Sequence, residues 1–253
     1  MPLITLTTDF GEGSVYTAQL KGILHQRIPT AVVSDVAHNI PSYNIPASAF
    51  AIQSAAANYP ANTAHIGLVN LYSSEQPRML LTQHEKQIFI VPDNGLLPLI
   101  VPGVKLQVYA LKTNGHSLTT LFTAVADTLK LTFAKKPIEA KAVNDYMRSK
   151  LPEAILSNSS IKAQVLYIDA FGNIVWNLKA ETFETFRQGR RYEIGFRGGR
   201  IQQLSNNYAS VSDGETAAFF NSMGLLELAI NHGNAARLLG IDRSATLMIT
   251  FMQ

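Results

Sequence analysis

Short strand-like runs alternate with helix-like segments over the first part of the chain, and this alternation constrains the fold more than any other feature. The expected strands are apolar runs containing β-branched residues, and the expected helices carry apolar residues at helical spacing. We expect strands at 3–8, 31–36, 64–69 and 87–91, and helices at 15–26, 46–58 and 124–134. Because strands that alternate with helices usually pair in parallel, the sequence predicts a mostly parallel sheet covered by helices.

The pattern changes after residue 151. Residues 152–161 are rich in small and polar residues, which indicates a connector. Further strand-like pieces follow at 163–169, 173–178, 191–196 and 246–252, and a short helix is one interpretation of part of residues 225–239. We therefore expect an N-terminal α/β domain over residues 1–151 and a smaller C-terminal domain over residues 162–253, rich in antiparallel β-structure.

Composition excludes several classes of function. The chain has 253 residues, of which 47% are hydrophobic, so it can bury a substantial core. No apolar run approaches the roughly 18–20 residues that span a bilayer, and no secretory signal is visible, so we expect a cytoplasmic protein without a membrane partner. Cysteine is absent and the histidines lack metal-ligand spacing, so no metal site is expected. The sequence has neither a dinucleotide fingerprint nor a Walker-type loop, so no bound cofactor is expected. The net charge is +3 and the basic residues are scattered, which argues against a nucleic-acid partner.

Polar residues stand where the strands of the expected parallel sheet end. Asp9 follows the first strand, Asp35 and His38 follow the second, and Asn70 follows the third, while Asp-Asn-Gly at 93–95 follows the fourth. The carboxyl ends of parallel strands lie at one edge, so these side chains could line one ligand crevice. The alternatives are that Asp9 caps the next helix, that residues 93–95 form an ordinary tight turn, and that His38 is structural.

The second domain offers a candidate base-binding segment. Asp169, Phe171 and Asn173 lie close together, and an aromatic face beside an amide suits a purine. The same residues would also make an ordinary β-turn with polar positions. Farther along, Glu227 follows the polar segment around Ser222 and could pair with a ligand ammonium or be a solvated helix residue.

Six segments in a fixed order then identify a family resemblance. They are TTDFG (7–11), AQLKG (18–22), SDVAHNIPSYNI (34–45), PDNGLL (92–97), IDAFGNIVWN (168–177) and NSMGLLELAINHGNAA (221–236). With these segments the chain resembles the S-adenosylmethionine (SAM) hydroxide adenosyltransferase family, which is related to fluorinase and chlorinase. The resemblance implies an α/β N-terminal domain, a β-rich C-terminal domain, and a homotrimer whose ligand lies between the N-domain of one subunit and the C-domain of the next.

The resemblance also implies a reaction and a set of contacts. Water would attack C5′ of SAM and release adenosine and methionine, with SAM as substrate and no other cofactor. Asp9 would bind the ribose diol, Phe171 and Asn173 the adenine, and Asp169 and Ser222 the methionine end. The full set of expected substrate-binding residues is Asp9, Ser14, Tyr43, Ser73, Asn94, Asp169, Phe171, Asn173, Tyr208, Ser222 and Glu227.

The expected catalytic residues depart from the family pattern. Hydrolases of this family use an Asp–Arg–His set for the water, and here Asn70 replaces the acid, Arg78 matches the arginine only after a shift, and His116 is displaced by about one residue. Ser14 stands where relatives usually carry an aspartate. An asparagine cannot accept a proton as a carboxylate can. We therefore predict a SAM hydrolase with an altered catalytic set. The alternatives are a non-catalytic or regulatory binder of an adenosine-containing ligand, and an enzyme acting on another nucleoside or with another nucleophile.

Overall fold

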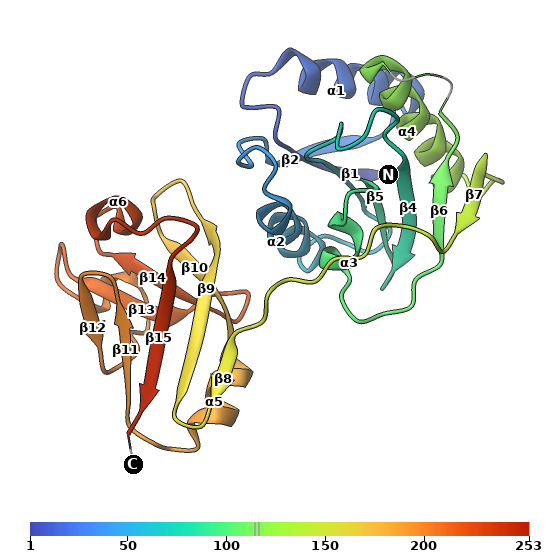
Figure 1. Ribbon diagram of the computed structural model, residues 1–253. Helices are drawn as coiled ribbons and strands as arrows, with labels where there is room; N and C mark the ends of the chain where they lie inside the picture. The colour runs from blue at the N-terminus through green and yellow to red at the C-terminus, as the bar shows by residue number, and fades with distance from the viewer. Residues whose placement is uncertain (114, 116, 253) are drawn as a thin grey trace. The chain divides into compact units, whose positions relative to one another are not determined.

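The protein consists of two compact units, Met1–Lys150 and Leu151–Gln253, in a computed structural model that describes residues 1–113, 115 and 117–252. Figure 1 shows the helices and strands of each unit in chain order. Within the described residues no helix is both long enough and apolar enough to cross a membrane.

The first unit is built on a seven-stranded mixed sheet with the strand order β2-β1-β3-β5-β4-β6-β7. Parallel pairing is confined to the first four strands in this order, and β4, β6 and β7 add antiparallel pairs. The strands are β1 (Leu3–Thr8), β2 (Val32–Ala37), β3 (Ala64–Leu68), β4 (Met79–His84), β5 (Gln87–Pro92), β6 (Val108–Leu111) and β7 (Ala140–Val143). The polar carboxyl ends of β1, β3 and β5 therefore come side by side, as the parallel pattern predicts.

Helices cover both faces of this sheet (Figure 1). Helices α1 (Val15–Arg27) and α4 (Leu118–Phe133) bury apolar side chains against the face that carries Ile4 and Leu6. Helix α2 (Ile45–Ala56) packs on the other face and contacts the short α3 (Leu96–Ile100). Gly67 in β3 allows this close approach, because a Cβ there would lie 2.5 Å from Cδ1 of Ile52.

The second unit is an antiparallel sheet of eight strands in the order β12-β11-β15-β9-β10-β14-β13, with β8 paired to β9. Its core contains the fully buried side chains of Trp176 and Phe183. The elements are β8 (Ile155–Ser157), β9 (Ser160–Ile168), β10 (Ile174–Lys179), α5 (Ala180–Arg187), β11 (Tyr192–Phe196), β12 (Gly199–Ile201), η1 (Tyr208–Ser210), β13 (Thr216–Phe220), β14 (Leu225–Ile230), α6 (Ala235–Leu239) and β15 (Thr246–Phe251). The segment expected as a connector thus contains β8 and the start of β9.

The predicted fold class, an α/β part followed by an antiparallel β part, is confirmed. The sheet of the first unit is more mixed than expected, because β4, β6 and β7 join it in antiparallel fashion. Strand β4 escapes prediction because it joins β5 through a two-residue turn, Glu85-Lys86, in which both residues have positive φ (46° and 64°). Such turns normally carry Asn-Gly or Asp-Gly, so this one leaves no sequence signal.

Candidate functional site

Three strand ends of the first unit are tied together around the Asp9 carboxylate. Oδ2 of Asp9 accepts a hydrogen bond of 2.9 Å from the backbone N–H of Asn70. The Asn94 side chain donates to the carbonyls of Val69 (2.8 Å) and Asn70 (3.1 Å), and its own Oδ1 accepts from the N–H of Leu96 (3.2 Å). The structure therefore brings together Asp9, Asn70 and Asn94, which the sequence analysis placed in one crevice, and it makes Asn94 a buried brace for the Asn70 loop.

Asn70 has the left-handed backbone conformation, with φ of 49°. Asparagine tolerates this region better than most residues. In this conformation its N–H points to Asp9, so Asn70 acts through its backbone on the neighbouring acid. Its side chain stands where the family resemblance places the acid of the water-activating set.

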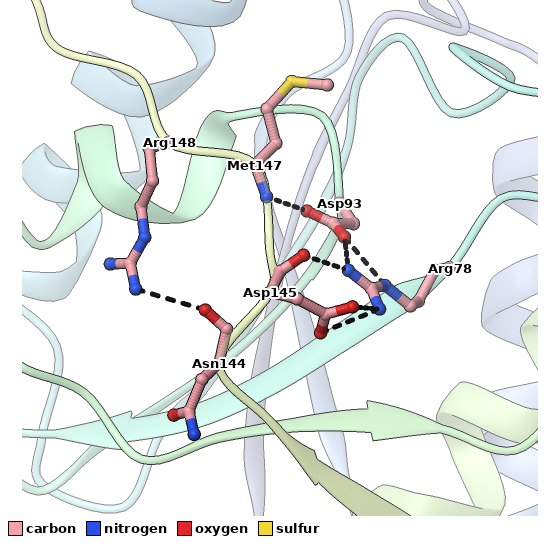
Figure 2. A network of polar contacts seen from close by, with 6 residues as sticks. All are labelled: Arg78, Asp93, Asn144, Asp145, Met147 and Arg148. Carbon is pink, nitrogen blue, oxygen red and sulfur yellow. Dashed lines mark hydrogen bonds and ion pairs between the residues drawn. The ribbon is translucent and has the colours of Figure 1, made fainter.

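Arg78 is bound to two carboxylates (Figure 2). It lies directly before β4 and Asp93 directly after β5, and these two strands pair so that the two residues are neighbours at the end of the ladder. Nε of Arg78 donates to Oδ2 of Asp93 (2.7 Å), and Nη2 forms an ion pair with the same oxygen. Nη1 lies 3.3 Å from the Asp145 carboxylate, and Nη2 also donates to the Asp145 carbonyl (2.8 Å). These acids raise the pKa of Arg78, the hydrogen bond to Asp93 contributing most.

This network fastens the last segment of the first unit to the loop after β5. Oδ1 of Asp93 accepts from the N–H of Met147 (2.7 Å), and the Ser149 hydroxyl donates to the carbonyl of Gly95 (2.5 Å). The contacts found for Arg78 among the described residues are with this segment and with Asp93. The guanidinium expected to act on a water molecule is thus held by acids that come from distant parts of the sequence.

The remaining expected residues of the first unit lie on exposed or helix-starting positions. Ser14 caps α1, with its hydroxyl accepting from the N–H of Tyr16 (3.2 Å). Tyr43 lies between β2 and α2, is 75% exposed and has a φ of 64°. Ser73 is exposed in the loop after β3. His116 lies outside the described residues.

In the second unit the turn between β9 and β10 presents an aromatic ring. Oδ1 of Asp169 accepts from the N–H groups of Phe171 (2.9 Å) and Asn173 (2.8 Å), and Oδ2 accepts from the Asn173 side chain (3.0 Å). Phe171 is 78% exposed, whereas Asn173 is buried. The turn predicted as one alternative is therefore present, and its Asp169 carboxylate holds it together while the ring of Phe171 projects from it.

Helix α6 supports this turn from behind. Gly172 has φ of 87°, and a Cβ there would lie 2.2 Å from the Asn234 side chain. Asn234 caps α6 by accepting from the N–H of Arg237 (2.8 Å). The N–H of Ala236 donates to the Gly172 carbonyl (2.9 Å). Only glycine fits here without displacing the cap, so the position of the turn is fixed by the start of α6.

A buried carboxylate joins the other expected residues of this unit. Glu227 lies in β14 and is 5% exposed, so the alternative of a solvated helix residue is wrong. Its Oε1 accepts from the Tyr208 hydroxyl (2.6 Å) and its Oε2 from the Asn221 amide (3.0 Å). Partial burial and the hydrogen bond to Glu227 raise the pKa of Tyr208 well above its usual range. Oδ1 of Asn221 accepts from two backbone N–H groups of the turn that carries Ser222, so Glu227 anchors this turn and Tyr208 together.

Of the residues in this hydrogen-bond network, Glu227 is expected from the sequence but its partner Asn221 is not. Asn221 is absent from the expected site residues, although the Asn-Ser-Met-Gly sequence is typical of a turn with an Asx cap. Asp93 and Asp145, the partners of Arg78, are likewise not expected as a pair. Nothing in the sequence relates Asp145 to Arg78, which lies 67 residues earlier.

Comparisons with known proteins agree with the two-unit arrangement. The family models of the SAM hydroxide adenosyltransferase N-terminal and C-terminal domains match residues 4–155 and 163–248. An (R)-S-adenosyl-L-methionine hydrolase of Methanocaldococcus jannaschii is 24% identical over 96% of this chain and 93% of its own, and one of Salinispora tropica is 26% identical over 98% of both. Among solved structures, an uncharacterized conserved protein from Thermotoga maritima is similar with a TM-score of 0.85 at 19% identity, covering 98% of this chain and 99% of its own. A conserved hypothetical protein from Thermus thermophilus has a TM-score of 0.77 at 24% identity, covering both chains fully.

Proposed function

The chain belongs to the SAM hydroxide adenosyltransferase family, and from this premise we propose that it is a SAM hydrolase that forms adenosine and methionine. In the reaction the oxygen of a water molecule bonds to C5′ as the C5′–sulfur bond breaks. The bonding electron pair goes to sulfur, which becomes the neutral thioether of methionine, and the proton that the water loses passes to the solvent. The relatives named above carry the names of (R)-S-adenosyl-L-methionine hydrolases, which supports this reaction class.

The fixed carboxylate of Asp9 is the observation that carries the proposal. One of its oxygens accepts the Asn70 N–H, which orients the group at the end of β1. A carboxylate has about four lone-pair sites, so Asp9 keeps enough acceptor capacity for two ribose hydroxyls. A charged acceptor for a vicinal diol at the carboxyl edge of a parallel sheet is the arrangement that nucleoside ligands use in open α/β folds.

The turn of Phe171 supports binding of the adenine base. Its exposed ring offers a flat apolar face on a turn that Asp169 and α6 hold in place. The Asn173 side chain gives one amide hydrogen to Asp169, which leaves its carbonyl oxygen and second hydrogen to read the base edge. We assign the ribose to Asp9 and the adenine to Phe171 and Asn173.

The proposed reaction demands little covalent help from the protein. A sulfonium is already a good leaving group, so the main tasks are to hold C5′ and the water in line and to remove bulk solvent. Asn70 can orient a water through its amide oxygen but cannot take its proton. Since a general base typically contributes about 10²–10⁴-fold, we expect turnover to be slow by comparison with relatives that keep the acid.

A second candidate function is a binder of SAM or adenosine without turnover. The observation that favours it is that the Arg78 guanidinium forms ion pairs with Asp93 and Asp145. With an asparagine at position 70 as well, two members of the expected water-activating set are not set up to activate water. Asp9 uses only the backbone N–H of Asn70, so neither change removes a proposed binding group.

Incubation of the purified protein with each SAM epimer distinguishes the two functions. Chromatography measures adenosine and methionine, and calorimetry measures binding. A hydrolase forms both products in equal amounts, and the Asp9→Asn variant forms less of both because its ribose acceptor is weakened. Ligand binding without products would identify a binder, and the absence of both would refute the family function for this chain.

The Asn70→Asp variant tests the role of the missing acid. If water activation limits the rate, the restored carboxylate should raise turnover by about tenfold or more, since it supplies part of a general-base effect. Asn58→Asp is a matched control that should leave the rate unchanged, because Asn58 is an exposed asparagine after α2 whose side chain donates to the Ser54 carbonyl. An unchanged rate in Asn70→Asp would contradict this view of catalysis. We also propose that the protein is a homotrimer with its ligand sites at the subunit interfaces, which light scattering and an interface variant can test.

A further inference from the structure

The Asp9 carboxylate stands on a loop that needs support from outside. Gly11 and Gly13 of this loop both have positive φ (89° and 70°), and neither has atoms within 4 Å of the place a Cβ would occupy. Glycine backbone is the most costly to order, so the loop gains its fixed conformation only at an entropic cost. The contacts that fix Asp9 must therefore come from neighbouring elements.

His38, in the loop after β2, contacts the chain on both sides of Asp9. Its carbonyl accepts from the N–H of Gly11 (2.9 Å), and Nδ1 of its ring lies 2.9 Å from the hydroxyl oxygen of Thr8. The Thr8 oxygen in turn accepts from the N–H of Phe10 (3.3 Å). His38 therefore contacts the chain on both sides of Asp9: it binds Thr8 through its side chain and Gly11 through its backbone carbonyl.

The His38 ring is itself oriented by charged neighbours. Its Nε2 lies 2.9 Å from Oδ1 of Asp35, at an angle too oblique for a hydrogen bond. Oδ2 of Asp35 forms an ion pair with Nζ of Lys21 at 2.6 Å. A carboxylate beside Nε2 favours the hydrogen on that nitrogen, so Nδ1 accepts from the Thr8 hydroxyl. The chain Lys21–Asp35–His38–Thr8 thus runs from α1 through β2 to the last residue of β1.

We propose that His38, oriented by Asp35, is a positioning residue that sets the Asp9 carboxylate for the ribose hydroxyls. This inference rests on the proposed function, because it presumes that Asp9 binds the ribose. His38 itself does not touch the ligand in this proposal. Binding groups must be held within about 0.5 Å of their working place. The two contacts of His38 add to the hydrogen bond from the Asn70 N–H in providing that restraint.

The test compares adenosine with 2′,3′-dideoxyadenosine, which lacks the two hydroxyls. Calorimetry gives the dissociation constant of each compound for the wild type and for His38→Ala. We expect the variant to bind adenosine about tenfold more weakly, because part of a hydrogen bond to a charged group is lost. Its affinity for dideoxyadenosine should change less than about twofold, since that compound makes no use of Asp9.

Two further variants separate positioning from simple loss of structure. His38→Asn should restore most of the adenosine affinity, because its amide reaches the place of Nδ1 and can bond to Thr8. His84→Ala is the matched control, because His84 lies at the end of β4 and has a partly exposed side chain. It should leave both affinities unchanged. Asp35→Asn replaces His38→Ala if that variant does not fold, because the Asp35 side chain is partly exposed. It should also weaken adenosine binding, since the His38 ring loses the carboxylate that orients it.

The outcomes distinguish this inference from the proposed function. If the wild type binds both compounds equally, the ribose role of Asp9 is refuted and the inference falls with it. If the wild type prefers adenosine and His38→Ala keeps that preference, the inference alone is overturned. An equal loss for both compounds would also overturn it, because the loss would not depend on the diol.

Discussion

A buried histidine should make the first unit lose stability in mild acid. His65 lies in β3 and is 1% exposed. Its Nδ1 is 2.8 Å from the Thr5 hydroxyl oxygen, and its Nε2 is 3.4 Å from Oε1 of Gln87. The Gln87 amide nitrogen donates to the carbonyls of Ala56 and Tyr59, so its Oε1 is an acceptor and Nε2 of His65 carries the hydrogen. Burial lowers the pKa of His65, so the ring is neutral at neutral pH, with Nδ1 as the acceptor of the Thr5 hydroxyl.

The size of the effect follows from the pKa of this ring. Burial lowers the pKa of His65 from 6.5 to about 4, since the charged imidazolium would lose its hydration. Between these two values the unfolded chain binds a proton that the folded chain does not, so stability is fully present above about pH 6.5 and falls as the pH is lowered towards about 4. From about pH 7 to about pH 5 this one group removes about 2 kcal/mol of unfolding free energy.

Urea unfolding of the wild type and of His65→Gln at both pH values measures this contribution. Far-UV circular dichroism is the suitable probe, because the single tryptophan, Trp176, lies in the second unit. The variant starts from a lower stability but should lose about 2 kcal/mol less than the wild type on acidification. His84→Gln, a change at a partly exposed histidine, should keep the wild-type loss. Equal losses in the wild type and His65→Gln would refute the assignment of the neutral ring.

Two other predictions concern the supports of the candidate site. Arg78→Ala leaves the mostly buried Asp93 carboxylate without its cation, so it should lower the unfolding free energy by about 2 kcal/mol. Amide hydrogen exchange in residues 144–149 should become faster, and unchanged exchange would contradict the view that Arg78 holds this segment in place. Gly172→Ala places a Cβ against Asn234 at a positive φ, so it should lower the melting temperature and weaken adenosine binding. Gly214 also has a positive φ but has open space around it, so Gly214→Ala should lower the melting temperature less. Equal effects of the two variants would show that backbone strain alone matters.

The parallel part of the fold could be predicted well from the sequence. Strands β1, β2, β3 and β5 lie within one residue of the expected bounds. For β1, β3 and β5 the reason is that strands buried on both faces are rich in apolar residues, whereas β2 is an edge strand that begins with two β-branched valines. Helix α4 begins at Leu118, six residues before the expected start. Its first turns carry several threonines, which are poor helix formers, and the start is set by the Ser117 cap instead.

The candidate site could be predicted only where neighbouring strand ends define it. Asp9, Asn70 and Asn94 meet because β1, β3 and β5 pair in parallel, and this pairing follows from the alternation of strands and helices. Arg78 is expected from the sequence to act on water, but its partners come from a turn and from a segment 67 residues away. Such contacts depend on the antiparallel part of the sheet, which left no clear pattern in the sequence.

Two of the expected site residues, Asn70 and Tyr43, have a left-handed backbone conformation. A residue other than glycine in the left-handed region costs on the order of 1 kcal/mol and persists only where its surroundings impose it. For Asn70 the surroundings are visible, since Asn94 holds its carbonyl and Asp9 receives its N–H. Tyr43 carries the same cost although the residue is 75% exposed, so little core packing offsets the strain. We propose that a flat ligand stacked on Tyr43, which the family resemblance places among the substrate-binding residues, would compensate for this strain.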